Sequence, residues 1–252
     1  MLTYCILVPV IMLTALVYAS VGLGGGTAYL SIVSFWNSDP TTLRPMAWSL
    51  NIVASSAAFW NFRRQGHFDA RLAWPFLVGG VLGATIGGAI QVEKAAFQAM
   101  LAIALICASL QMLLAKGKPG TRSSRKPPVL PSLFVGTTIG IISGLVGIGG
   151  GIVLGPVLVA LGWVDMKTLA PITSLYILLN SSAALTSFLL TGGNIDLPLT
   201  GVFCVAVLAG GFIGSRWGAE KASESKLRRV FGIVALVAGV KLSYEYLRLM
   251  GG

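Results

Sequence analysis

The chain has 252 residues, of which 55% are hydrophobic and only 10% are charged. Because a soluble globular domain carries about a quarter charged residues, this composition excludes an ordinary water-soluble fold and favours an integral membrane protein. The net charge of +10 does not indicate a nucleic-acid partner, since the basic residues sit in short loops between apolar runs, where cytoplasmic positive charge is expected. The predicted partner of most of the surface is the lipid bilayer.

Taken in chain order, the apolar runs predict about eight membrane segments. They cover residues 2–36, 45–62, 72–90, 95–115, 130–164, 169–190, 197–213 and 230–247. Each run is near or above the roughly 20 residues that a helix needs to cross the hydrocarbon core. The first run lacks the basic start of a signal peptide, so we expect it to belong to the mature chain. The fold class that follows is an all-α, multi-pass integral membrane protein.

Short motifs recur in the same order in the two halves of the chain. The matches are GLGGG at 22–26 with GIGGG at 147–151, SSAA at 55–58 with SSAA at 181–184, and GHFD at 66–69 with GNID at 193–196. The offset between matching residues drifts only from 125 to 127. We therefore predict two four-segment membrane repeats, residues 1–115 and 130–252, joined by a basic cytoplasmic linker at residues 116–129.

The first apolar run of each half is interrupted by three successive glycines. Either run, at about 35 residues, would form a straight helix of roughly 50 Å, against a hydrocarbon core of about 30 Å. We expect both runs to break at the Gly-Gly-Gly cluster and to form re-entrant hairpins. Three full spans would then remain in each half, the repeats would be inverted, and most Lys and Arg residues would share the cytoplasmic face. The alternative is eight plain spans in parallel repeats.

The glycine clusters are the leading candidate for a substrate site. Three successive glycines disfavour a continuous helix and free backbone groups that lipid cannot satisfy, so they should face a protein cavity. A helix that restarts at Thr27 or Ile152 would aim unpaired N–H groups and the positive end of its dipole into that cavity, which suits an anion. Close helix packing through small residues is the alternative. The predicted binding residues in these clusters are Gly24, Gly25, Gly26, Thr27, Gly149, Gly150 and Gly151.

Uncharged polar residues of the second and sixth segments complete the predicted site. They are Ser49 and Asn51 in the first half and Thr173, Ser174 and Asn180 in the second, at positions interpreted as corresponding between the halves. Hydroxyls and amides can donate hydrogen bonds to an oxyanion without the cost of a buried charge. The alternative is hydrogen bonding between helices, which carries more weight for the serines than for the asparagines.

Charged and reactive residues contribute little to this hypothesis. Arg44 and Lys167 lie just before the second and sixth segments, where anchoring at the membrane interface is favoured over attraction of an anion. No acidic residue occupies the middle of a segment, so a carboxylate relay is not predicted, and the site should offer positive partial charge without a buried full cation. Without a His cluster, a nucleophile–base pair or paired cysteines, neither an enzyme nor a cofactor or metal site is predicted.

The duplicated GxGGG motif, the APITSL start of the sixth segment at 170–175 and the RRQGHFD loop at 63–69 resemble the TauE/SafE sulfite exporter family. The likeness covers nearly the whole chain. It implies a permease of the bacterial inner membrane for sulfite, sulfonates or other small organosulfur or carboxylate anions. Trp48 departs from the small-polar pattern that the family would predict there, so symmetrical roles for the two halves are not expected.

The mechanism favoured by these observations is alternating access to a small anion. An anion channel or facilitator of the same architecture and a carrier of small carboxylates are the alternatives. The direction of transport, the coupling ion and the formation of a homo-oligomer are left open by the sequence.

Overall fold

The computed structural model describes residues 2–34, 39–66, 68–114, 127–161, 163–164 and 166–221, with short helical pieces between 236 and 247. The named helices are α1 (Leu2–Ala19), α2 (Gly26–Val33), α3 (Pro40–Arg63), α4 (Ala70–Ala89), α5 (Lys94–Leu114), α6 (Val129–Val146), α7 (Gly151–Ala160), α8 (Met166–Leu190) and α9 (Leu197–Lys221). Within these ranges the chain is all-helical and has no strand. The predicted linker, the basic loop at 221–229 and the last apolar run fall mostly outside the described residues.

Several helices begin where an aspartate caps them. Asp39 accepts a hydrogen bond from the Thr41 amide at the start of α3, and Asp69 accepts one from the Arg71 amide at the start of α4. Asp196 accepts one from the amide of Leu199 at the start of α9. Because an aspartate oxygen satisfies an N–H group that has no partner within the helix, these residues set the helix starts locally.

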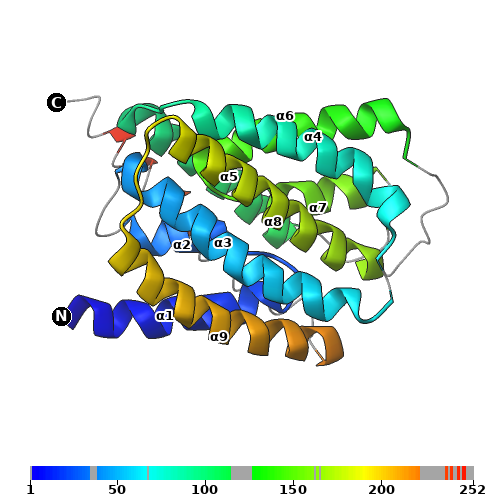
Figure 1. Cartoon of the computed structure of the whole chain (residues 1–252), viewed down its shortest axis with the longest axis horizontal. Helices are drawn as coiled ribbons and strands as arrows, with labels where there is room; N and C mark the ends of the chain where they lie inside the picture. The colour runs from blue at the N-terminus through cyan, green and yellow to red at the C-terminus, as the bar shows by residue number, and fades with distance from the viewer. Residues whose placement is uncertain are drawn as a thin grey trace.

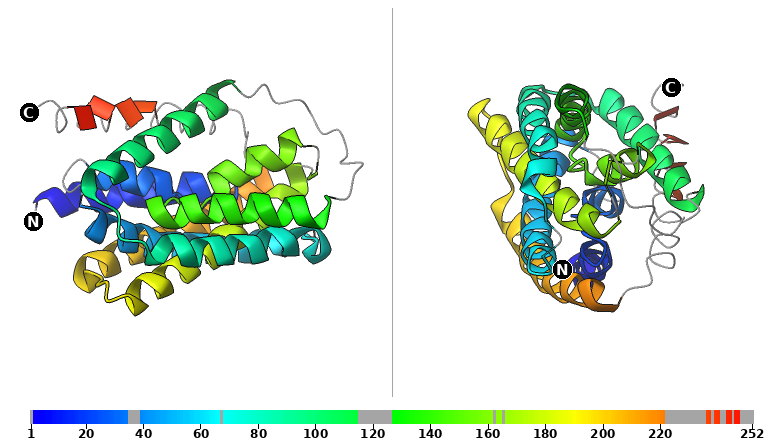
Figure 2. Two further views of the ribbon diagram at one scale, coloured as in Figure 1. Left: turned by 90° about the horizontal axis from the view of Figure 1, so that it is seen from above. Right: turned by 90° about the vertical axis from the view of Figure 1, so that its right-hand side faces the viewer.

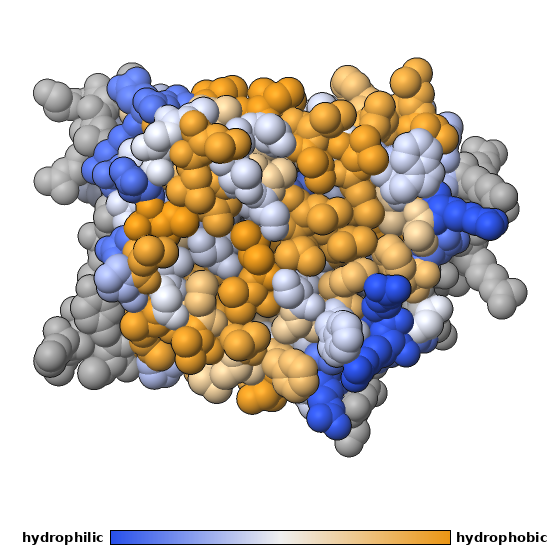
Figure 3. Space-filling view, viewed as in Figure 1, coloured by the Kyte–Doolittle hydropathy of each residue, from blue (hydrophilic) through white to orange (hydrophobic). Residues whose placement is uncertain are grey.

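The outer surface of the helices suits lipid. Among the described residues, four helices, α4, α6, α8 and α9, are long and apolar enough to cross a membrane, whereas the equally long α3 carries Arg44, Asn51 and several serines. Large apolar side chains point outward, among them Leu82, Phe134 and Val205, the last two more than 70% exposed. Figure 3 shows apolar residues spread over much of one face, with hydrophilic residues gathered toward the ends. Contiguous exposed apolar surface on this scale marks a membrane environment.

The helices pack in matched pairs (Figure 1). The most extensive contacts are those of α4 with α6 and of α1 with α9, followed by α4 with α8 and α3 with α9, while α3 packs against α8. Exchanging α1 with α6, α3 with α8 and α4 with α9 turns the first four helix pairs into one another and leaves the α3–α8 pair unchanged.

Glycines bring α4 close to α6 and α9 close to α1. Gly79, Gly83 and Gly87 of α4, spaced four residues apart, face backbone atoms of α6, and a side chain on any of them would collide with that backbone. In the counterpart pair, Gly210 and Gly214 of α9 face the backbone of α1 in the same way. Small residues at every fourth position are a common device for close helix packing in membranes.

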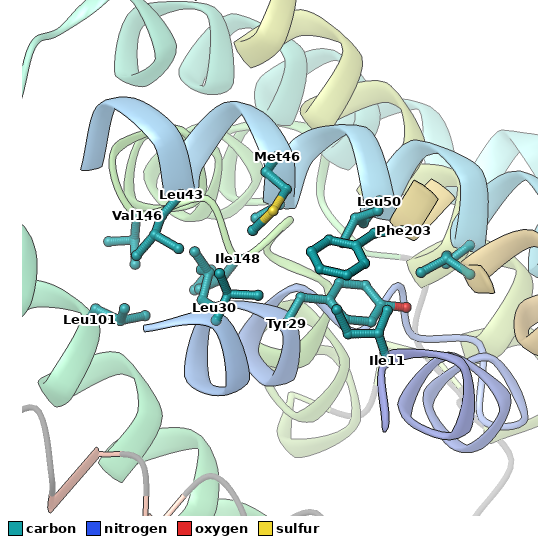
Figure 4. Close-up of a cluster of buried hydrophobic side chains, with 14 of the residues drawn as sticks. Ile11, Tyr29, Leu30, Leu43, Met46, Leu50, Leu101, Val146, Ile148 and Phe203 are labelled. Atoms are coloured by element: carbon teal, nitrogen blue, oxygen red, sulfur yellow. The ribbon is translucent and has the colours of Figure 1, made fainter. Parts of the chain in front are cut away.

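Two helical hairpins stand where the long apolar runs were expected to break. α1 ends at Ala19 and α2 begins at Gly26, while α6 ends at Val146 and α7 begins at Gly151. Figures 1 and 2 show α2 and α7 each turning back beside the helix that precedes it. The second helices begin one residue earlier than predicted, at the last glycine of each cluster. In Figure 4, Ile148 of the second hairpin lies beside Leu30 of the first, so the hairpins meet in the core.

Candidate functional site

Both glycine breaks converge on two side chains at the crossing of α3 and α8. A methyl group added at Gly24 would lie 2.8 Å from the Asn51 amide oxygen and 2.9 Å from Ile177. One added at Gly149 would lie 2.9 Å from the Asn51 amide nitrogen and 2.8 Å from Ile177. Gly26 faces the Asn51 amide as well. The structure therefore brings together both breaks, one from each half, around Asn51 and Ile177.

The backbone of each break requires glycine. Gly25 has a φ of 92° and Gly150 a φ of 77°, in the left-handed region that other residues rarely adopt. The first hydrogen bonds within α2 and α7 run to the carbonyls of Gly25 and Gly150, from the amides of residues 28 and 29 and of residues 153 and 154. The preceding amides, including that of Thr27, have no partner within their helices. These helix starts thus offer N–H donors and positive partial charge at the breaks.

The two predicted asparagines are buried and incompletely hydrogen-bonded. Asn51 donates to the Gly147 carbonyl at 3.3 Å, and its amide oxygen has no partner among the described residues. Neither polar atom of Asn180 has a partner at full hydrogen-bond geometry within the same ranges, although its side chain interacts with the Tyr176 hydroxyl, and it lies against Gly80 of α4 rather than at a glycine break. Both side chains are completely buried. Unpaired buried amides are costly, so they call for a functional explanation.

The predicted hydroxyl groups are engaged with backbone. Ser49 donates to the Pro45 carbonyl and Ser174 to the Ala170 carbonyl, each at 2.8 Å and within its own helix. Thr173 also donates within α8, and it reaches the Gly22 carbonyl of the first break at 3.3 Å. Of these three hydroxyls, the described hydrogen bonds therefore connect only that of Thr173 to a glycine break.

The expected correspondence of the asparagines between the halves is wrong. The offset of 126 that pairs Ser55 with Ser181 pairs Asn51 with Ile177 and Asn180 with Ala54. The contacts agree, because Asn51 and Ile177 occupy equivalent places beside both breaks. One half thus supplies an amide at the crossing and the other a hydrocarbon side chain.

The expectation that Arg44 anchors α3 at the membrane interface is also wrong. The side chain is 2% exposed, and the guanidinium donates to four carbonyl oxygens at the ends of α4 and α6. Nη2 donates to Gly87 at 2.9 Å, to Gly144 at 3.0 Å and more weakly to Gly88 at 3.4 Å, and Nη1 donates to Ile90 at 3.0 Å. Helix ends carry unpaired carbonyls and negative partial charge, which is why a cation is stable there.

A buried full cation was therefore missed when the site was predicted to have none. The sequence carried no signal that distinguished Arg44 from an interface residue, because Arg44 directly precedes the apolar run at 45–62. The side chain of Lys167 lies outside the described residues. In the part of the chain that the structure describes, no three His, Cys, Asp or Glu residues come together as metal ligands.

An apolar exterior around an interior where broken helices and buried amides meet is the architecture of a multi-pass membrane transport protein. Residues 7–242 match the family described as "Sulfite exporter TauE/SafE", and the chain belongs to that family. It is also similar to the "Probable membrane transporter protein y4hK" of Sinorhizobium fredii, with 30% identity over 233 residues that cover 90% of this chain and 93% of that protein. No solved structure matches the chain.

Proposed function

We propose that the chain is a carrier for a small anion, with sulfite or an organic sulfonate as the favoured substrate. The observation that carries the proposal is the convergence of two glycine breaks, one from each half, on Asn51 and Ile177 where α3 packs against α8. Helix N-termini and amide N–H groups stabilise negative charge, and each contributes on the order of 1 kcal/mol. A few such contacts, offset by the dehydration of the anion, correspond to micromolar-to-millimolar affinity, which permits release.

The carrier would work by alternating access between inverted repeats. The matched packing of α4 with α6 and of α1 with α9 supports a rocking motion of one half against the other, around a site to which both halves contribute. In this proposal the two hairpins are re-entrant, residues 1–115 and 130–252 are the repeats, and the basic linker at 116–129 is cytoplasmic in a bacterial inner membrane.

Counterflow in proteoliposomes tests the transport mechanism. Vesicles containing purified protein and unlabelled sulfite should take up external labelled sulfite faster than vesicles without internal sulfite, because a carrier returns faster when loaded. An anion channel of the same architecture would show no such stimulation. Competition by methanesulfonate but not by acetate is expected for the sulfur-oxyanion class, whereas competition by acetate alone would favour a carboxylate carrier. Preferential transport of a cation or a neutral sugar would contradict the proposal.

The inverted arrangement has its own test. Single cysteines at Ser124 and Ser223 should both be protected from a membrane-impermeant thiol reagent in intact cells and both react in inverted membranes. Reaction of only one of them from outside would favour eight plain spans instead.

A further inference from the structure

Arg44 has one donor nitrogen without an acceptor in the described part of the chain. While Nη1 and Nη2 donate to helix-end carbonyls, Nε has no acceptor among the described residues. One turn further along α3, the indole Nε1 of Trp48 is also buried and has no acceptor in those ranges. The guanidinium carbon lies 4.9 Å from the centre of the Trp48 ring. Two buried N–H donors without an acceptor in the described residues thus belong to side chains that stack on each other.

The charge of this place favours an anion. Among the described residues the Arg44 guanidinium donates to carbonyl groups, and the helix ends to which they belong carry only partial negative charge, about half an elementary charge each. Charge-assisted hydrogen bonds to an oxyanion are roughly twice as strong as neutral ones. An oxyanion can also present a separate oxygen to each of two donors, whereas a carbonyl group has only one oxygen.

Helix α8, from the second half of the chain, packs against Trp48. The Trp48 ring packs edge-on against Phe188 of α8, with ring centres 5.6 Å apart, and Ala184 belongs to the same buried cluster. One turn before Ala184 on α8 lies Asn180, a buried amide whose polar atoms have no partner at full hydrogen-bond geometry in the described chain. A ligand at this place would therefore contact α3 of the first half and α8 of the second.

We propose that Arg44 and Trp48 form an oxyanion subsite that determines the charge selectivity of transport, with a sulfite or sulfonate group bound at Arg44 Nε and Trp48 Nε1. The subsite rests on the proposed function and deepens it: the glycine breaks supply neutral donors, and Arg44 supplies the full positive charge that distinguishes an anion from a neutral molecule of the same shape.

The test compares two probes of nearly equal shape, anionic methanesulfonate and neutral methanesulfonamide, for binding to the purified full-length protein. Wild type should bind sulfite and methanesulfonate and prefer methanesulfonate to methanesulfonamide. Trp48→Phe keeps an aromatic ring beside Phe188 and removes the N–H donor. We expect it to raise the dissociation constant of methanesulfonate roughly tenfold, within the usual range for one hydrogen bond to a charged group. Binding of methanesulfonamide should change far less.

The matched control lies on the same helix. Arg64 stacks on Trp60 with its guanidinium carbon 4.6 Å from the ring centre, but Trp60 is 56% exposed. Trp60→Phe should leave both affinities unchanged. Arg44→Lys, which keeps a cation but loses the planar fork, should reduce the preference for methanesulfonate; if this variant does not fold, the Trp48 comparison still decides.

Three results would overturn the subsite. They are unchanged methanesulfonate affinity in folded Trp48→Phe, equal losses for the two probes, and a wild type that binds neither sulfite nor methanesulfonate. Failure of the transport proposal is distinct from these results. If sulfite counterflow fails while Trp48-dependent anion binding persists, the subsite stands without the transport proposal; if counterflow succeeds while binding is independent of Trp48, only the subsite is rejected.

Discussion

The central helices α3 and α8 show how two similar sequences can share a frame and differ in chemistry. Each helix has a proline in its second turn and carries the SSAA motif at a matching position. Each also packs against the glycine break of the other half. A methyl group at Gly22 would meet Ala170 of α8, and one at Gly147 would lie 3.5 Å from the backbone of Arg44 of α3. The backbone relations are thus equivalent.

The side chains at equivalent positions are unlike. An offset of 126 pairs Arg44 with Ala170, Trp48 with Ser174 and Asn51 with Ile177. The first half therefore holds the cation, the indole and the amide, where the second half holds two small residues and a hydrocarbon. Backbone packing tolerates this divergence because the glycines, rather than the side chains opposite them, set the close approaches. Helix α3 consequently supplies the cation, the indole and the amide beside both glycine breaks, while the buried amide of α8 is Asn180.

The largest effect on stability is expected when α3 loses Arg44, the cation that α8 lacks. Arg44→Met leaves helix-end carbonyls of α4 and α6 without a donor in the interior, which should reduce the free energy of unfolding by about 2–5 kcal/mol. The yield of monodisperse protein and its apparent melting temperature measure this change. Arg63→Met, at the exposed far end of α3, is the control and should behave as wild type. Equal stability of the two variants would show that the buried hydrogen bonds of Arg44 contribute little.

A smaller effect on stability, with a large effect on transport, is expected at the breaks. Gly25→Ala and Gly150→Ala place a methyl at positive φ, 2.8 Å from the ring of Tyr29 and 2.9 Å from that of Tyr176, respectively. Each should cost about 1–2 kcal/mol of stability and reduce sulfite counterflow at least tenfold. Gly66→Ala is the control, because Gly66 has the same φ of 77° as Gly150 but has no atom within 4 Å of the added methyl. Counterflow reduced equally in all three variants would trace the loss to backbone strain alone.

The smallest effects are expected on ligand affinity, and they should differ between a buried amide and a hydroxyl that is already hydrogen-bonded. Asn180→Leu keeps roughly the side-chain volume and removes a buried donor, so it should weaken methanesulfonate binding about tenfold at matched folding. Ser49→Ala removes a hydroxyl that already donates within its own helix, and it should change affinity by less than about 0.5 kcal/mol. Isothermal titration of both variants gives the comparison. Unchanged affinity in Asn180→Leu would assign that amide to helix packing.

Local pattern predicted most of the described helices and the two interruptions at the glycine clusters. Long apolar runs specify helices because lipid cannot satisfy free backbone groups, and three successive glycines interrupt a helix wherever they occur. The apolar runs and the breaks after Ala19 and Val146 follow from these local rules. Aspartates such as Asp69 set helix starts by the same kind of short-range contact. Such features depend on neighbours only a few residues away, so the sequence by itself determined them.

The partners of Arg44 and Asn51 were decided by the tertiary structure alone. The carbonyls that accept hydrogen bonds from the Arg44 guanidinium lie up to 100 residues away in the sequence. The Gly147 carbonyl that accepts one from Asn51 is 96 residues away. Seen in sequence, Arg44 sits at the start of an apolar segment, where an interface position is the usual outcome. Only the packing of α3 against the ends of α4 and α6 buries it, because unpaired helix-end carbonyls together provide the partial charge that a cation needs to leave water.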